Sequence, residues 1–117
     1  MIAKQAMELA NLTSIESWQD QLEWQPFDTG IEIYQLYEPQ QDGSQAALLR
    51  YLPGASVPLH EHPGFEHILV LSGEQSDENG TYSAGSLVIN PPGSRHSVIS
   101  KKGCIVLLIW EKPIIRC

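Results

Sequence analysis

The stretch that decides the fold runs Gly54-Ala-Ser-Val-Pro-Leu-His60-Glu-His62-Pro-Gly-Phe-Glu66-His-Ile-Leu-Val-Leu-Ser-Gly73, and a second runs Gly85-Ser-Leu-Val-Ile-Asn-Pro91-Pro-Gly93-Ser-Arg-His96. Side chains two residues apart leave the same face of a strand, so His60 and His62 are expected to point together. Glu66 follows a Pro-Gly turn and can return beside them on the next strand. His96 follows a second Pro-Gly turn, where a neighbouring hairpin could bring it in. Three neutral imidazoles and one carboxylate suit a divalent transition metal such as zinc, iron or manganese.

These two stretches resemble the two motifs of the cupin superfamily. The first fits G-x5-H-x-H-x3-E-x6-G throughout, and the second fits G-x5-P-x-G-x2-H-x3-N except that Ser100 replaces the final Asn. Further residues resemble the cupin domain of ChrR-type anti-sigma factors, namely Leu48-Leu-Arg-Tyr-Leu-Pro-Gly54, Ser76-Asp-Glu-Asn-Gly80, Asn90-Pro-Pro-Gly-Ser94 and Gly103-Cys104. The resemblance implies a small β-barrel whose metal ligands are His60, His62, Glu66 and His96. The replacement of the motif's final Asn by Ser100 removes no ligand.

Length and charge limit the classes of partner. A chain of 117 residues is expected to form one domain, and its seven basic and fourteen acidic residues give a formal net charge of −7. That charge repels phosphate backbones and anionic lipids, so neither nucleic acid nor a membrane is expected as a direct partner. The sequence has no apolar run of membrane-spanning length and no signal peptide, which predicts a cytoplasmic protein.

Short apolar or alternating runs separated by Gly and Pro predict an all-β fold, an antiparallel jelly-roll barrel. The resemblance implies that this barrel is a cupin jelly roll (double-stranded β-helix). Residues 1–20 are expected to form a short N-terminal arm and residues 21–117 the cupin domain. The strands are predicted at Glu23–Phe27, Ile31–Tyr37, Ala46–Leu52, His60–His62, Glu66–Leu71, Gly80–Ser83, Ser86–Asn90, His96–Ser100 and Ile105–Trp110.

Two of these strands contain a run that is apolar at every position, Ile68–Leu71 and Ile105–Ile109. Such strands are buried on both faces, for example where one face meets the barrel interior and the other a partner subunit. We therefore predict a homodimer.

Five other residues have both a functional and a structural interpretation. Arg50 could hold a substrate carboxylate if it pointed inward, although an outward arginine is the commoner case. Tyr51 and Trp110 could line a ligand pocket or belong to the core. Cys104 is interpreted as a buried small apolar residue rather than a redox sensor. Strand alternation turns His67 away from Glu66, which predicts a packing or supporting role rather than a metal ligand.

Two functions remain open on these residues. The resemblance to ChrR-type proteins implies a sensory, regulatory or small-molecule-binding cupin with one divalent metal. The N-terminal arm contains no Cys or His, so we expect no anti-sigma zinc domain here and no sigma-factor partner. The alternative is an iron-type dioxygenase that acts on a small chelating organic molecule. No phosphate-binding glycine loop or catalytic triad is present, and no catalytic residue is assigned.

Overall fold

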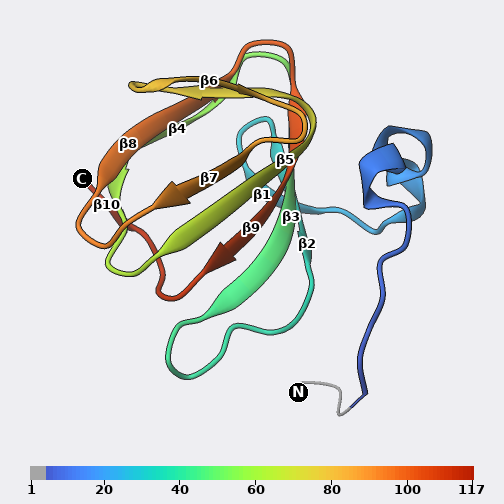
Figure 1. The fold of residues 1–117 in the computed structure, drawn as a ribbon, viewed down its shortest axis with the longest axis horizontal. Coiled ribbons are helices and arrows are strands. Elements are labelled where there is room, and N and C mark those ends of the chain that lie inside the picture. The colour runs from blue at the N-terminus through green and yellow to red at the C-terminus, as the bar shows by residue number, and fades with distance from the viewer. Residues whose placement is uncertain (1–4) are drawn as a thin grey trace.

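A computed structural model describes residues 5–117, so the first four residues of the predicted arm lie outside the described residues. Two short 3-10 helices come first and strands make up most of the rest (Figure 1). The elements are η1 (Leu12–Ser17), η2 (Gln19–Gln21), β1 (Gln25–Asp28), β2 (Ile31–Gln35), β3 (Gln45–Tyr51), β4 (Ala55–Glu61), β5 (Glu66–Asp77), β6 (Gly80–Ser83), β7 (Leu87–Asn90), β8 (Arg95–Ser100), β9 (Cys104–Trp110) and β10 (Ile115–Arg116).

The strands form one curled antiparallel sheet in the order β1-β2-β3-β9-β5-β8-β4-β10, with β6 and β7 also paired to β5. The first part of β5 pairs with β7 and β9, and its last residues pair with β6. The sheet therefore folds over at β5 into the predicted cupin jelly roll (Figure 1).

The predicted end of the fifth strand at Leu71 was wrong, because β5 continues to Asp77. The register shifts between Val70 and Ser72, and Gly73 then takes a φ of +73°. A Cβ at Gly73 would lie 2.1 Å from the Gly103 carbonyl oxygen, so glycine is required where the two chains meet. The end of the apolar run thus marks a bend in the strand and not its end.

The predicted strand His60–His62 was also placed too late, since β4 runs from Ala55 to Glu61. Pro58 lies where the β4–β8 register shifts, between Val57 and His60. Proline has no N–H to donate to a neighbouring strand, and this loss costs least where the pairing is already irregular. Pro58 therefore does not end the strand.

The outer face of the sheet explains the strands that are apolar on both sides. Ile15 of η1 is fully buried and packs with Leu48, Leu71 and Ile105, in a cluster separate from the barrel core. The helical turns lie outside the barrel, against this face (Figure 1). The arm therefore covers much of the apolar outer surface on which the prediction of a partner subunit was based.

Arg50 fastens the arm to the sheet. Its guanidinium donates to Glu32 Oε1 at 2.8 Å, pairs with Asp20 Oδ1 at 3.1 Å and lies 4.5 Å from the Trp24 ring centre. The outward orientation predicted as the commoner case is confirmed, but the side chain is 20% exposed and is held by the arm.

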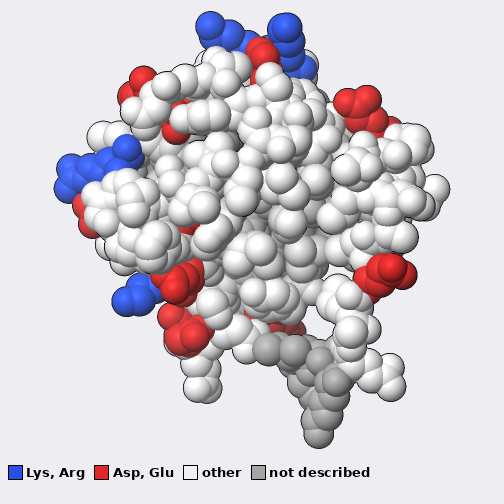
Figure 2. Space-filling view, in the orientation of Figure 1, with Lys and Arg blue, Asp and Glu red and all other residues white. Residues whose placement is uncertain are grey.

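The surface carries its charges in scattered groups. In Figure 2 acidic and basic side chains lie around the rim of the face in view, and the middle of that face is uncharged. Among the described helices, none is both long and apolar enough to cross a membrane.

Candidate metal centre

Two strands and two loops bring three histidines together. His60 near the end of β4 and His96 near the start of β8 are direct cross-strand partners. His62 lies just beyond β4, where its N–H donates to the Ser94 carbonyl at 2.9 Å and its carbonyl accepts from the Gly93 N–H at 2.7 Å. This backbone pairing ties the His62 loop to the Pro-Gly turn that precedes His96.

The three imidazoles form a compact buried cluster. His60, His62 and His96 are 4%, 1% and 3% exposed, and their ring centres are 4.6–5.0 Å apart. One nitrogen from each ring can be chosen so that the chosen nitrogens all lie within 4.8 Å of one another. The predicted convergence of these histidines from separate segments of the sequence is confirmed.

The hydrogen bonds of the three Nδ1 atoms determine the tautomers. His60 Nδ1 lies 2.9 Å from the Pro58 carbonyl, and His96 Nδ1 lies 3.0 Å from Asp77 Oδ2. Both oxygens act as acceptors, so each Nδ1 carries the proton. His62 Nδ1 lies 2.9 Å from Ser94 Oγ, whose own proton is donated to the Pro91 carbonyl, so Ser94 also accepts. All three Nε2 atoms are left with a free lone pair.

Two of these lone pairs have no hydrogen-bond partner. Among the buried side-chain polar atoms of residues 5–117, only His62 Nε2 and His96 Nε2 lack one. Glu66 Oε1 lies 3.1 Å from His62 Nε2 and 3.9 Å from His96 Nε2. Because the imidazole proton is on Nδ1, the contact between His62 Nε2 and Glu66 Oε1 places a lone pair next to a carboxylate oxygen. It is repulsive unless a cation lies between them.

Glu66 is placed by the strand register. It begins β5 opposite Asn90 of β7, and Asn90 Nδ2 donates to Glu66 Oε1 at 3.2 Å. Glu66 is buried, so its side chain faces the interior and not the solvent. It contacts two of the three imidazoles, whereas the set of mutually close ligand atoms consists of histidines alone.

The site fits a metal better than a proton. Burial is the largest cause lowering the pKa of His60, so this ring stays neutral near neutral pH and keeps its lone pair. Each unsatisfied buried polar atom costs about 1–3 kcal/mol, which a shared cation would remove. Three neutral imidazole nitrogens and one carboxylate form a donor set suited to a divalent transition metal.

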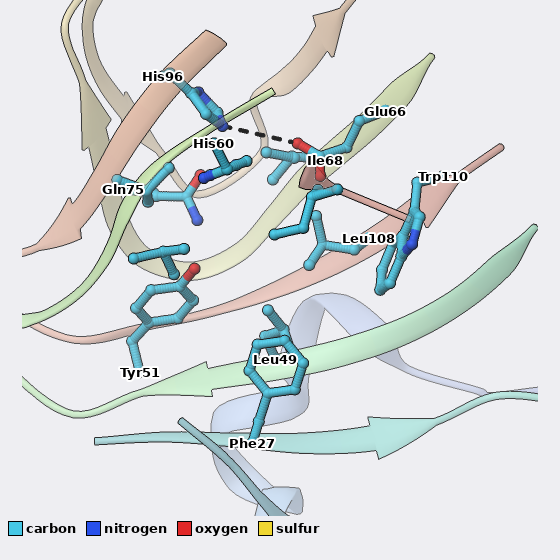
Figure 3. Close-up of a pocket in the computed structure, with 13 residues that line it drawn as sticks. Phe27, Leu49, Tyr51, His60, Glu66, Ile68, Gln75, His96, Leu108 and Trp110 are labelled. Atoms are coloured by element: carbon cyan, nitrogen blue, oxygen red, sulfur yellow. Dashed lines mark ion pairs between the residues drawn. The ribbon is translucent and has the colours of Figure 1, made fainter. Parts of the chain in front are cut away.

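A cavity of about 60 Å³ lies beside this cluster inside the barrel. His60, Glu66 and His96 form one side, and the rest of the wall is mostly apolar (Figure 3). Tyr51 and Trp110 belong to this wall and also to the hydrophobic core, so both positions considered for them are observed. Its other lining residues are Phe27, Leu49, Val57, Ile68, Gln75, Val98, Leu108 and Ile114.

Tyr51 and Gln75 bring polar atoms to this apolar wall. Both side chains are buried and line the cavity. Burial is the largest cause raising the pKa of Tyr51, so its hydroxyl remains protonated and can donate. In the view of Figure 3 the Gln75 amide lies between His60 and the Tyr51 hydroxyl.

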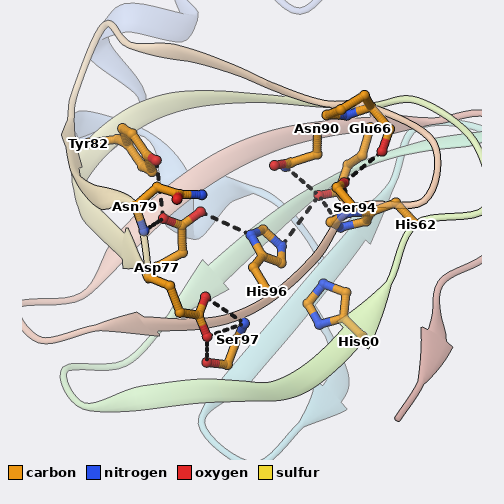
Figure 4. A network of polar contacts seen from close by, with 12 residues as sticks. His60, His62, Glu66, Asp77, Asn79, Tyr82, Asn90, Ser94, His96 and Ser97 are labelled. Atoms are coloured by element: carbon orange, nitrogen blue, oxygen red, sulfur yellow. Dashed lines mark hydrogen bonds and ion pairs between the residues drawn. The ribbon is translucent and has the colours of Figure 1, made fainter.

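Asp77 is a residue of the site that the sequence reasoning missed. Its carboxylate accepts from His96 Nδ1 through Oδ2, and through Oδ1 from the Asn79 N–H at 2.8 Å and the Tyr82 hydroxyl at 3.1 Å (Figure 4). Asp77 lies outside both histidine stretches. The Asn79-Gly80 sequence that follows predicts the hairpin turn, but it does not predict that Asp77 contacts His96.

Three remaining predictions concern residues away from the metal cluster. His67 faces away from Glu66 and stacks on Phe65 with ring centres 6.3 Å apart, so its packing role is confirmed. Cys104 is buried, as predicted, and burial raises the pKa of its thiol to about 11. Ser100 donates to the Glu74 carbonyl at 2.6 Å and is not part of the ligand cluster, which agrees with its departure from the motif removing no ligand.

The family follows from sequence comparison. The ChrR Cupin-like domain matches residues 15–112, and the chain belongs to this family. It is also 35% identical over 75 residues to the anti-sigma-E factor ChrR of Cereibacter sphaeroides, covering 62% of this chain and 35% of that protein. The chain thus spans about a third of the length of this curated relative.

Solved structures with the same fold include proteins of two kinds. A putative acetylacetone dioxygenase from Methylibium petroleiphilum PM1 superposes with a TM-score of 0.75 at 20% identity, over 97% of this chain and 83% of that one. A chain in the complex of Rhodobacter sphaeroides SigE with the anti-sigma ChrR gives 0.68 at 24% identity, over 92% and 70%. At these identities the likeness shows the cupin fold alone.

Proposed function

We propose that this protein is a metal-binding ChrR-like cupin that holds one divalent transition metal through His60, His62, Glu66 and His96. Its role would be sensory, regulatory or small-molecule binding. One observation carries the proposal: three buried imidazoles direct free Nε2 lone pairs to one place, and two of these lone pairs face a buried carboxylate with no hydrogen bond. A divalent cation satisfies all four groups at once.

The identity of the metal would determine what the site can do. Zinc with four protein ligands is tetrahedrally closed, which suits a stabilising or sensory role. Six-coordinate iron or manganese would keep two positions for water or a chelating ligand and would supply Lewis acidity there. The donor set accepts both kinds of metal, so the choice between them is an experimental one.

Charge and size restrict the ligand that the cavity accepts. The cavity measures about 60 Å³. One water molecule needs about 10–15 Å³ on the same scale, so the cavity has room for a molecule of only a few non-hydrogen atoms. No Lys or Arg is among its lining residues. A divalent ion and Glu66 together carry one positive charge, so a neutral or singly negative chelator leaves no unbalanced negative charge in the apolar cavity.

Metal analysis tests the proposal directly. Protein purified without an affinity tag or chelator is expected to contain about one zinc, iron or manganese per chain by elemental analysis. His62→Ala should lose this metal, while His67→Ala, which removes a histidine on the opposite face of the sheet, should retain it. A metal-free native protein that also fails to take up zinc, iron or manganese on reconstitution would refute the metal site.

The second candidate is an iron-dependent dioxygenase acting on a small chelating substrate. The cavity favours it, because an apolar space of this size directly beside His60, Glu66 and His96 is where such a substrate would lie. The similarity in fold to an acetylacetone dioxygenase agrees with it. Ferrous protein given acetylacetone should consume one dioxygen per substrate, and zinc protein should consume none. Absence of oxygen uptake by fully iron-loaded protein with this and other small diketones would leave the binding role.

Tyr51 and Gln75 are proposed to hold a polar atom of the ligand. Cobalt-loaded protein should change its visible spectrum when acetylacetone binds, and Tyr51→Phe should weaken this binding several-fold, because one hydrogen bond is lost. The doubly charged chelator oxalate should bind less tightly than acetylacetone. Tighter binding of oxalate than of acetylacetone would contradict the ligand class. Unchanged binding of acetylacetone by Tyr51→Phe would contradict the role of Tyr51.

A homodimer is proposed through the part of the outer face that the arm leaves uncovered. Leu87 and Ile89 on β7 and Ile109 on β9 are 59%, 53% and 46% exposed, and β7 pairs only with β5 among the described strands. A second copy could use the same patch and edge in a symmetric contact. Ile89→Lys should convert the dimer to a monomer in sedimentation analysis. A wild-type monomer at high protein concentration would end this proposal.

A further inference from the structure

At the Nδ1 atom, His96 alone among the three histidines has a charged partner. His96 Nδ1 and Asp77 Oδ2 are 3.0 Å apart, and the two side chains are 3% and 4% exposed. The corresponding partner of His60 is the Pro58 carbonyl, and that of His62 is the Ser94 hydroxyl, both of which are neutral. A hydrogen bond to a buried carboxylate is stronger than one between neutral groups. His96 is therefore the imidazole whose orientation is most firmly fixed.

Asp77 is itself held from the side opposite His96. Its Oδ1 accepts the Asn79 N–H and the Tyr82 hydroxyl, which leaves Oδ2 directed at the imidazole. Figure 4 shows Asp77 between Tyr82 and His96. Burial, and next the hydrogen bond to Asp77, raise the pKa of Tyr82, so this phenol keeps the proton that it donates.

The β5–β6 hairpin supplies this whole arrangement. Asp77 ends β5, Tyr82 lies on β6, and the turn between them contains Asn79. His96 comes from β8, which is another part of the barrel. The hairpin contributes no atom to the histidine cluster, but through Asp77 it controls the direction and the protonated nitrogen of one member.

We propose that Asp77 is a positioning residue for the metal centre: its carboxylate keeps the His96 proton on Nδ1, fixes the ring, and makes Nε2 a stronger electron donor. The inference rests on the proposed metal-binding function, because it concerns the same site. A histidine ligand backed by a carboxylate is oriented and made more basic, and removing such a partner typically weakens metal binding about 10–100-fold.

Zinc affinity and the tautomer of His96 test the proposal together. Zinc binding to the full chain, measured by competition with a chromophoric chelator, should weaken about 10–100-fold in Asp77→Ala. Asp77→Asn keeps the shape and an acceptor oxygen but loses the charge, so its affinity should fall between those of the wild type and Asp77→Ala. In metal-free protein at pH 8, ¹⁵N NMR should show His96 protonated at Nδ1 in the wild type and a mixture of tautomers in Asp77→Ala.

Glu78→Gln is the matched control, because Glu78 is the adjacent acid and accepts from the Ser97 N–H at 3.1 Å instead of from a histidine. It should bind zinc within about twofold of the wild type and leave the His96 nitrogen shifts unchanged. Zinc affinity within twofold of wild type in Asp77→Ala, with unchanged nitrogen shifts, would overturn the role of Asp77. If Asp77→Ala does not fold, Asp77→Asn with wild-type affinity would overturn it.

The two readouts separate this inference from the proposed function. If wild-type protein binds no transition metal, the metal site fails, yet the tautomer of His96 in metal-free protein still shows whether Asp77 controls it. If metal binds with equal strength in every variant, the metal site stands and the positioning role is refuted.

Discussion

His60 and His96 are direct cross-strand partners of β4 and β8, with ring centres 4.7 Å apart. Both point into the barrel, so the histidine cluster exists only in this register. A slip of one residue would turn one of the two rings to the opposite face of the sheet. Metal binding by this cluster would therefore be thermodynamically coupled to the correct pairing of β4 with β8.

Zinc is expected to stabilise the fold through this coupling. At a free zinc concentration a hundred times its Kd, a site present only in the folded state adds about 2.7 kcal/mol. For a domain of this size the thermal midpoint should rise by roughly 10 °C. Calcium, which prefers oxygen ligands, should have no such effect and is the control in the same scanning calorimetry experiment. An unchanged midpoint in saturating zinc would contradict a folded-state metal site.

Leu48 is expected to be essential to the packing of the arm on the sheet. It is fully buried in the outer cluster with Ile15, and Leu48→Ala should cost about 2–5 kcal/mol of unfolding free energy by opening a cavity. Leu52 has the same side chain but is 61% exposed, so Leu52→Ala should cost less than about 0.5 kcal/mol. Urea denaturation of both variants measures the difference. Equal costs would mean that the outer cluster contributes nothing.

Arg50 is expected to hold the arm in place. Arg50→Met keeps the alkyl chain but loses the contacts to Asp20, Glu32 and Trp24, at a cost of about 1–2 kcal/mol. A glutamate-specific protease should then cleave the arm at Glu16 faster than in the wild type. The matched control is Arg95→Met, since Arg95 is 60% exposed and pairs with Glu61 away from the arm. Similar cleavage rates in the two variants would argue against the role of Arg50.

Cys104 is expected to make the protein less stable at high pH. Burial raises the pKa of its folded thiol to about 11, above the ordinary value of about 8.5. Between these two pKa values the unfolded state releases the thiol proton and the folded state keeps it. The resulting destabilisation is absent below about pH 8, and the free energy of unfolding falls as the pH rises toward 11. Burial of Tyr51 raises its pKa and acts in the same direction.

Urea denaturation at pH 8 and pH 10 measures this loss, and Cys104→Ala should reduce it. Iodoacetamide at pH 8 should modify the exposed Cys117 in native protein and both cysteines in denaturant. Rapid native modification of Cys104, seen by mass spectrometry, would show that the thiol is accessible.

The sequence alone determined the fold class and which histidines meet. The spacing of His60 and His62 on one strand, with His96 after a Pro-Gly turn, is a local pattern that alternation and turn chemistry convert into a common direction. Alternation likewise placed His67 on the other face. The strand ends at Leu71 and His60 were misjudged, because Gly73 and Pro58 lie at register shifts that depend on the neighbouring strands.

The tertiary structure alone decided how the site is supported. Asp77 reaches His96 across 19 residues of sequence, and Ser94 reaches His62 across 32. No local pattern encodes such pairs, because they depend on how far the barrel curls and on which residues it leaves in contact. The packing of the arm on Leu48 and Ile105 likewise depends on contacts between segments that are distant in sequence. Periodicity fixes which way a side chain points, whereas its partner is fixed only when distant segments close on one another.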